Sequence, residues 1–213
     1  MHFLILIITS YLLGSIPFGL LIAKAHGKDL RKIGSGNIGA TNLARAVGKK
    51  WAYIGFAMDV SKGLLPTLAA ANLIDQPPTT FQLLLWIAAG SAAVIGHIFP
   101  VYIKFKGGKG VATSLGVALG IWPYFTVPAI FAATVWALTV LTTKYISLGS
   151  IIAAIIFPLV ILTIVIISPK WQFQNLWPLV ITAFAIPTMV IIRHKSNIKR
   201  LINGSENRVL TKK

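Results

Sequence analysis

The stretch FLILIITSYLLGSIPFGLLIAKA, residues 3–25, is apolar for almost its whole length, and Lys24 is the one acidic or basic residue in it. A helix that crosses the hydrocarbon core of a bilayer needs about 20 consecutive, mostly apolar residues. No basic segment precedes this run and no clear small-residue cleavage site follows it. We therefore expect a retained first transmembrane helix rather than a signal peptide.

Further apolar runs follow along the chain, at residues 51–74, 81–103, 111–122, 124–143, 146–168 and 174–192. The fourth of the seven runs is short for a straight span, and Trp122-Pro123 ends it, because proline lacks a backbone donor and disfavours helix in the residue before it. We predict an all-α integral membrane protein with seven transmembrane helices, the fourth short. Merging the fourth and fifth runs would give the other parity.

The composition agrees with a membrane protein. Of the 213 residues, 56% are hydrophobic and 11% are charged, and the mean hydropathy is +0.80. A soluble domain is nearer to 45–50% apolar. The length fits one compact bundle, so we predict a single domain over residues 1–213. The chain has no cysteine, which excludes disulfides, thiol nucleophiles and cysteine-based metal sites.

Basic residues greatly outnumber acidic ones, with 20 Lys and Arg against 4 Asp and Glu. In a soluble protein this excess would suggest nucleic acid, but beside long apolar runs it indicates a basic cytoplasmic face. Seven spans with the N-terminus outside and the C-terminus in the cytoplasm place 18 of the 20 cations on the cytoplasmic side. Such a face suits small anionic substrates or anionic lipid, although membrane topology alone also gathers cations there.

The first polar cluster is GSGNIGATNLARAVGKK, residues 34–50. We expect Ser35 or Asn37 to cap a short helix that ends at Gly48. The N–H groups at the start of a helix, together with the guanidinium of Arg45, suit a phosphate group. The alternative is a capped interfacial helix with ordinary basic residues.

The second cluster is KFKGGKGVAT, residues 104–113. We expect Gly107, Gly108 and Gly110 to let backbone amides converge as an anion-binding nest, at the start of a helix that begins at Val111. The stretch is not a nucleotide-binding P-loop, because the first glycine and the final Ser or Thr of that motif are absent. The alternative is a flexible basic turn on the cytoplasmic side.

The third cluster is TKYISLGS, residues 143–150. Ser147 and Ser150 are three residues apart and share one face of a helix. Small polar residues often pack between membrane helices, and we interpret Ser150 in that way. For Ser147, packing and substrate binding are equally supported.

The fourth cluster is RHKSNIKRLINGSE, residues 193–206. His194 and Asn197 are three residues apart at the end of the last span, so they can face one pocket together. The alternative is a basic amphipathic segment that anchors the last helix at the membrane surface.

Two ionisable residues lie inside the second predicted span. Asp59 and Lys62 are three residues apart, and intramembrane charges are costly and often functional. Mutual pairing is a sufficient reason for them, so we interpret them as structural. We interpret His97, which precedes Phe99-Pro100, as a core histidine rather than a site residue.

Taken together, these stretches resemble the bacterial membrane glycerol-3-phosphate acyltransferases that use acyl phosphate, the PlsY family. The resemblance covers the whole chain in order and runs through YLLGSIPFG, GSGNIGATNLARAVGKK, HIFPVYIKFKGGKGVATSLG, KYISLGS and RHKSNIKRLINGSE. It implies a multi-pass protein of the bacterial inner membrane, with seven helices, an outside N-terminus and an active site on the cytoplasmic side.

The resemblance also implies roles for individual residues. It makes Glu206 structural and places glycerol 3-phosphate at Gly107 to Gly110. The expected catalytic residues are Ser35, Arg45, His194 and Asn197. The expected substrate- and phosphate-binding residues are Asn37, Thr41, Asn42, Lys104, Gly107, Gly108, Lys109, Gly110, Thr113 and Ser147. We expect neither a metal nor a cofactor.

The implied reaction transfers the acyl group of acyl phosphate to the 1-hydroxyl of sn-glycerol 3-phosphate, which gives 1-acylglycerol 3-phosphate and phosphate. Because the donor is already activated, we expect no covalent acyl-enzyme, and positioning and charge stabilisation supply most of the rate. The departing phosphate can accept the hydroxyl proton. His194 is the main candidate for a general base, with Asp29 and Glu206 less suitable. Which phosphate site binds which substrate stays open.

Two other classes of function fit parts of the pattern. A carrier for phosphate esters predicts polar groups along a path through the bundle, and only Asp59 and Lys62 lie there. A scaffold that binds anionic lipid predicts scattered cations without glycine-rich turns. The one-sided polar clusters favour an enzyme that acts, we expect, as a monomer on a membrane lipid and a polar substrate.

Overall fold

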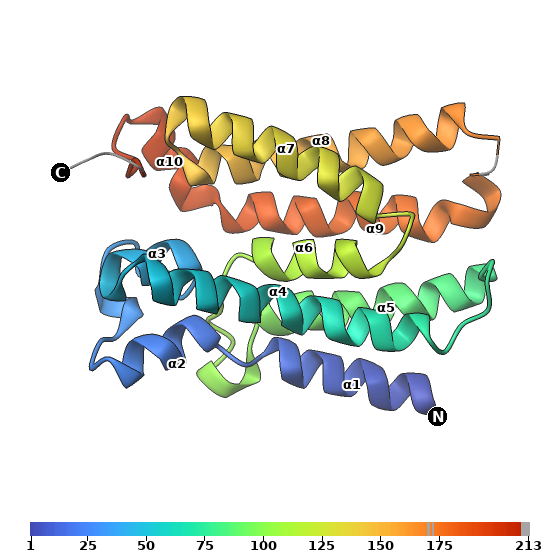
Figure 1. Cartoon of the computed structure of the whole chain (residues 1–213), viewed down its shortest axis with the longest axis horizontal. Helices are drawn as coiled ribbons and strands as arrows, with labels where there is room; N and C mark the ends of the chain where they lie inside the picture. Colours follow the sequence, from blue (N-terminus) through green and yellow to red (C-terminus); the bar gives the residue numbers. More distant parts are fainter. Residues whose placement is uncertain (170, 172, 210–213) are drawn as a thin grey trace. The chain divides into compact units, whose positions relative to one another are not determined.

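The computed structural model describes residues 1–169, 171 and 173–209. Within those residues every regular element is a helix, and no strand occurs. The chain divides into two compact parts, Met1–Ile121 and the residues from Trp122 onward. Figure 1 labels the helices of each part.

In the first part, the axes of the four longer helices are roughly aligned (Figure 1). Its longer helices are α1 (His2–Gly14), α4 (Lys49–Ala71), α5 (Thr80–Ile98) and α6 (Val111–Gly120). The helix α4 packs against the other three, and α1 packs against α5. Its shorter elements are α2 (Phe18–Ala25), α3 (Ala40–Val47) and the 3-10 turns η1 (Leu30–Lys32) and η2 (Val101–Ile103). Figure 1 shows α2 and α3 at the end of this part farthest from the N-terminus.

The first predicted span is two helices rather than one. The helix α1 ends at Gly14 and α2 begins at Phe18, with Pro17 between them. Proline cannot donate a backbone hydrogen bond, so the helix cannot continue through it without a loss. The hydroxyl of Ser15 donates to the carbonyl oxygen of Tyr11 at 2.8 Å beside the break. The prediction of one continuous helix over residues 3–25 is wrong in this respect.

In the described part of the chain, five segments are long and apolar enough to cross a membrane: His2–Ala25, Thr80–Ile103, Thr126–Thr143, Ile146–Ile167 and Gln174–Arg193. They coincide with five of the seven predicted runs. The other two runs are the 23-residue helix α4, which carries two buried ionisable residues, and the ten-residue helix α6. The count of seven therefore depends on α4 and α6.

The second part contains α7 (Thr126–Thr143), α8 (Ile146–Ile167), α9 (Phe173–Arg193) and the short α10 (Lys195–Ile202). The helix α8 packs against both α7 and α9, and α10 packs against α8 and α9. As predicted, no helix continues through Trp122-Pro123, because α6 ends at Gly120 and α7 begins at Thr126.

Glycines set the distance between α4 and α6. A Cβ atom added at Gly63 would lie 2.2 Å from the carbonyl oxygen of Thr113, and one added at Gly116 would lie 2.0 Å from that of Val60. These are backbone atoms and cannot turn aside. Small residues at helix contacts let membrane helices approach closely, which increases their dispersion contact.

We expect Gly63→Leu to destabilise the fold by about 3 kcal/mol, because the added side chain overpacks the contact between α4 and α6. The measurement is the midpoint of thermal unfolding in detergent. Ala57→Leu is the matched control, since it adds the same side chain to an exposed position of α4. Equal midpoints for the two variants would contradict the close packing.

Candidate functional site

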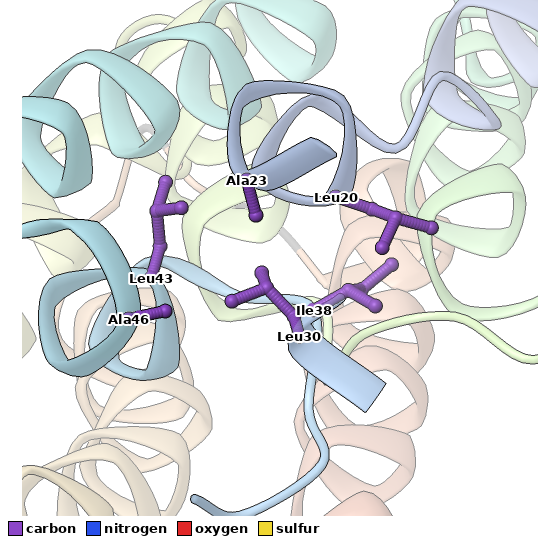
Figure 2. Close-up of a cluster of buried hydrophobic side chains, with 6 residues drawn as sticks. All are labelled: Leu20, Ala23, Leu30, Ile38, Leu43 and Ala46. Carbon is purple, nitrogen blue, oxygen red and sulfur yellow. The ribbon is translucent and has the colours of Figure 1, made fainter. Parts of the chain in front are cut away.

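A small apolar core supports the first polar cluster. Figure 2 shows buried side chains from α2, η1, α3 and the loop before α3 pointing toward one another: Leu20, Ala23, Leu30, Ile38, Leu43 and Ala46. The helix α3 buries its apolar face in this core, and the guanidinium-bearing Arg45 is exposed. The sequence therefore holds the loop in place with apolar contacts and leaves its cation at the surface.

Asn42 organises the loop that precedes α3. Its amide Nδ2 donates to the carbonyl oxygens of Leu30, Ile33 and Asn37 at 3.1, 2.9 and 2.9 Å. Its Oδ1 accepts from the backbone N–H of Ser35 at 3.1 Å. The residue is 1% exposed, and its side-chain amide bonds four backbone groups of the loop. Its binding to a substrate stays a prediction.

The predicted cap of α3 is wrong, although the predicted helix is present. Gly39 is the N-cap residue and makes no side-chain cap, and Gly48 follows the helix with φ at 100°. Asn37 Oδ1 accepts instead from the backbone N–H of Gly39 at 2.8 Å, and the Ser35 hydroxyl lies 3.5 Å from the N–H of Asn37. Both side chains therefore shape the loop. Ser35 is exposed, whereas Asn37 and Thr41 are half-buried.

Lys28, which was not among the predicted site residues, bonds the last turn of α3. Lys28 Nζ donates to the carbonyl oxygen of Ala46. A cation near the C-terminus of a helix is favourable because of the helix dipole. Nothing in the sequence distinguishes Lys28 from the other lysines of the loops.

The glycine-rich loop does not form the predicted nest at its first two glycines. The N–H of Gly107 donates to the carbonyl oxygen of Ile98 at 3.2 Å. The N–H of Gly108 donates to the carbonyl oxygen of His97 at 3.1 Å. These two amides therefore bond the end of α5. Gly110 has φ at 87° and precedes the helix that begins at Val111, as predicted.

The other candidates of this stretch differ in exposure. Lys104 is exposed and lies in the left-handed region with φ at 55°, while Lys109 is half-buried. Thr113 is fully buried in the first turn of α6, and its hydroxyl has no hydrogen-bond partner among the described residues. Its contact with α4 through Gly63 explains its burial, and its binding to phosphate stays a prediction.

The first two clusters lie together in the first part of the chain. Ile103, just before the glycine-rich loop, packs on the core beneath α3. Ile38 from the first cluster lines the same small cleft as His97 and Pro100. The structure therefore brings the segments around residues 34–47 and 97–110 to one end of this part.

The third and fourth clusters lie together in the second part. Glu206 Oε1 accepts from the hydroxyl of Ser147 at 2.8 Å and from Asn197 Nδ2 at 2.7 Å. Glu206 Oε2 accepts from Arg200 Nε at 2.6 Å. Ser147 is 6% exposed and Asn197 is 5% exposed. One carboxylate thus ties the start of α8 to α10, which agrees with the structural role that the resemblance implied for Glu206.

His194 lies between α9 and α10 and is 2% exposed. Its Nδ1 lies 2.7 Å from the carbonyl oxygen of Val190. A carbonyl only accepts hydrogen bonds, so Nδ1 carries a proton, and in the neutral ring Nε2 is the acceptor atom. This tautomer suits a ring that orients a hydroxyl or accepts its proton.

The two acidic candidates for a general base are both engaged. Burial raises the pKa of Glu206, but the hydrogen bonds from Asn197, Ser147 and Arg200 outweigh it and lower the pKa below its ordinary value. The side-chain hydrogen bonds from Arg31 lower the pKa of Asp29 to about 2. A carboxylate with a lowered pKa is a weak base, which disfavours both.

Ser150 packs between two helices, as predicted. Its hydroxyl donates to the carbonyl oxygen of Ile146 at 2.9 Å and accepts from Trp136 Nε1 at 3.3 Å. It therefore joins α7 to α8. Arg200 was not among the predicted site residues.

The sequence feature that could have indicated its role is its position six residues before Glu206, the one acidic residue of the C-terminal segment.

Comparison with known proteins identifies the family of the chain. A family model for glycerol-3-phosphate acyltransferases matches residues 4–204. The glycerol-3-phosphate acyltransferase of Aquifex aeolicus is 42% identical over 212 residues, which cover 98% of this chain and 100% of the relative. The enzyme of the same name from Trichlorobacter lovleyi is 46% identical over 199 residues, 93% of each chain. The chain belongs to the glycerol-3-phosphate acyltransferase family.

Two solved structures of this family are similar to the chain. Both are crystal structures of PlsY, an integral membrane glycerol 3-phosphate acyltransferase, at 40% identity. The glycerol 3-phosphate form has a TM-score of 0.83 and covers 98% of this chain and 96% of its own. The lysophosphatidic acid form has a TM-score of 0.79, with 98% and 95% covered. The predicted resemblance is confirmed, and the protein is an acyltransferase of a bacterial membrane.

In this acyltransferase we expect Asn42→Ala to lower the free energy of unfolding by about 2 kcal/mol, because buried backbone groups of the loop lose their partner. The midpoint of thermal unfolding in detergent measures the change. Asn72→Ala is the control, since Asn72 is exposed and its side-chain amide donates to the carbonyl oxygen of Leu68. A loss no larger than that of the control would contradict the role assigned to Asn42.

We expect Glu206→Gln to lower the stability of the acyltransferase by about 2 kcal/mol at neutral pH, since the charged hydrogen bond to Arg200 is lost. The folded pKa of Glu206 is depressed, so its contribution is complete above its ordinary value of 4.5 and is lost as the pH falls through the lower folded value. Thermal midpoints of wild type and variant should therefore converge in acid. A difference that stays constant with pH would exclude this origin.

Proposed function

We propose that this acyltransferase transfers the acyl group of an acyl phosphate to the 1-hydroxyl of sn-glycerol 3-phosphate. The products are 1-acylglycerol 3-phosphate, also called lysophosphatidic acid, and inorganic phosphate. The reaction is the first acylation in bacterial phospholipid synthesis. It needs no metal, no cofactor and no covalent acyl-enzyme.

The observation that carries the proposal is the pair of forms in which the similar structures were solved. One is described as the glycerol 3-phosphate form and the other as the lysophosphatidic acid form. These two molecules differ by one acyl group on a hydroxyl, so they are the acceptor and the product of a single acyl transfer. At 40% identity over nearly the whole chain, the same acceptor is the simplest assignment for this protein.

The choice of acyl phosphate as donor rests on the chemistry of the residues. The chain has no cysteine and only four acidic residues, so nucleophiles and bases are scarce. Asp29 and Glu206 are both engaged with arginines. An acyl phosphate is activated already, and its departing phosphate can take the proton of the attacking hydroxyl. The protein then supplies position and positive charge.

We assign the phosphate groups to cations of the first part. Arg45 and Ser35 are exposed beside the loop that Asn42 holds, and guanidinium groups bind phosphate through two parallel hydrogen bonds. Because the amides of Gly107 and Gly108 bond the end of α5, Lys109 and the first N–H groups of α6 are the better second site. Lys104 adds charge. Asn37 and Thr41 support the first site.

We assign the orientation of glycerol to the second part. His194 offers an acceptor nitrogen in its neutral form, and Asn197 and Ser147 lie close to each other through Glu206. We propose residues 1–213 as a single polytopic domain. The enzyme acts as a monomer.

The proposed topology has seven crossings, with the N-terminus outside and the C-terminus and reaction on the cytoplasmic side of the inner membrane. It adds α4 and α6 to the five long apolar segments. Support comes from charge, because 18 of the 20 Lys and Arg residues then lie on the cytoplasmic side. Glycerol 3-phosphate is polar and approaches from water, while the acyl donor lies in the bilayer.

The test uses purified full-length protein in detergent, with a long-chain acyl phosphate and radiolabelled glycerol 3-phosphate. We expect one phosphate released for each labelled product that co-migrates with lysophosphatidic acid. Arg45→Ala should lower kcat/KM about 10- to 100-fold, the effect of losing a hydrogen bond to a charged group.

The matched control is Lys50→Ala, which removes an exposed cation that lies over the ring of Trp51. It should keep wild-type turnover. Acyl-coenzyme A in place of acyl phosphate tests the donor. Turnover only with the coenzyme A ester would refute the donor, and no labelled lipid with either donor would refute the proposed reaction.

A further inference from the structure

Three buried ionisable side chains of the first part take no role in the proposed reaction. Lys62 Nζ lies 2.8 Å from Asp59 Oδ1, and His97 Nδ1 lies 3.6 Å from the same oxygen. Lys62, Asp59 and His97 are 2%, 4% and 6% exposed. A buried charge needs a partner, and the pairing of Lys62 with Asp59 supplies one. It does not explain why a histidine from α5 stands beside the pair.

One side of this cluster is anchored at the break between α1 and α2. Lys62 Nζ donates to the carbonyl oxygen of Ile16 at 2.9 Å and lies 5.7 Å from the centre of the Phe18 ring. The ammonium therefore has fixed contacts besides the carboxylate of Asp59. The carboxylate is held in turn, and it faces the Nδ1 side of the His97 ring.

The other side of the cluster is the glycine-rich loop. The carbonyl oxygen of His97 accepts from the N–H of Gly108 at 3.1 Å. A Cβ atom added at Gly108 would lie 2.2 Å from Nε2 of the His97 ring. The ring and the loop are therefore in direct contact, with room for glycine and for no larger residue.

We propose that His97 is a positioning residue for the glycine-rich loop. Its ring, oriented by Asp59, sets the place of Gly108 and thereby of Lys109 and the first N–H groups of α6, to which the proposed function assigns a substrate phosphate. This inference rests on that proposed function. A residue that packs against a binding group fixes the position of that group. The position of the binding group in turn affects how well a phosphate is held in the transition state.

A double-mutant cycle tests the contact between ring and loop. His97→Ala should lower kcat/KM about tenfold through the supporting role of the ring, and Gly108→Ala about 100-fold through displacement of the loop. In the double variant the added methyl occupies the space of the missing ring. Its activity should then exceed the product of the two single losses by about tenfold. His97→Gln, which keeps part of the reach and polarity, should be less impaired than His97→Ala.

Hydrogen–deuterium exchange gives a readout besides turnover. In His97→Ala, exchange should rise in the peptide covering residues 104–112 and stay unchanged in the peptides of α3, with the thermal midpoint close to that of wild type. His26→Ala is the control, because His26 is exposed and its ring packs on Trp51. It should change neither exchange nor kinetics.

Three outcomes would overturn the inference: wild-type kinetics in His97→Ala, single losses that simply multiply in the double variant, or unchanged exchange over residues 104–112. If His97→Ala does not fold, His97→Gln and the exchange of its loop decide. Failure of the proposed function is distinguishable, because the wild-type protein itself would then show no transfer while the exchange change in the loop would persist.

Discussion

A backbone carbonyl or N–H group without a hydrogen-bond partner is costly in hydrocarbon. Where a helix breaks in or near a membrane, its backbone groups therefore need other hydrogen-bond partners. Polar side chains provide such partners in the first part. Lys62 bonds the carbonyl oxygen of Ile16 where α1 ends, Lys28 bonds that of Ala46 in the last turn of α3, and Asn42 bonds the loop between η1 and α3. The loop before α3 owes its shape to the contacts of Asn42.

Features that depend on local chemistry were predictable. Apolar length predicted the helices, and the proline after Trp122 and the glycine before Val111 predicted where helices stop and start. The break at Pro17 was not predicted, because hydropathy is continuous across it. The direction of the amides at Gly107 and Gly108 was not predicted either. Glycine shows that a loop can turn, but the carbonyls of α5 that receive these amides are known only from the fold.

The candidate site followed a similar pattern. Exposed cations such as Arg45 and Lys104 stood out in the sequence, because they lie in glycine-containing polar stretches between apolar runs. The groups behind them did not stand out. Asn42 reads as one more polar loop residue until its four backbone contacts are seen, and His97 reads as a core residue until Gly108 is found against its ring. Sequence patterns therefore indicate exposed cations better than the buried groups that hold the loops in place.

Glu206 stands later in the chain than every residue it joins, and this order bears on biogenesis. Ser147 leaves the ribosome about sixty residues earlier, and Asn197 nine residues earlier, than the carboxylate that accepts their hydrogen bonds. Until that carboxylate emerges, the hydroxyl of Ser147 and the amide of Asn197 lack the acceptor that joins them. The link between the start of α8 and α10 is therefore completed only when translation reaches residue 206.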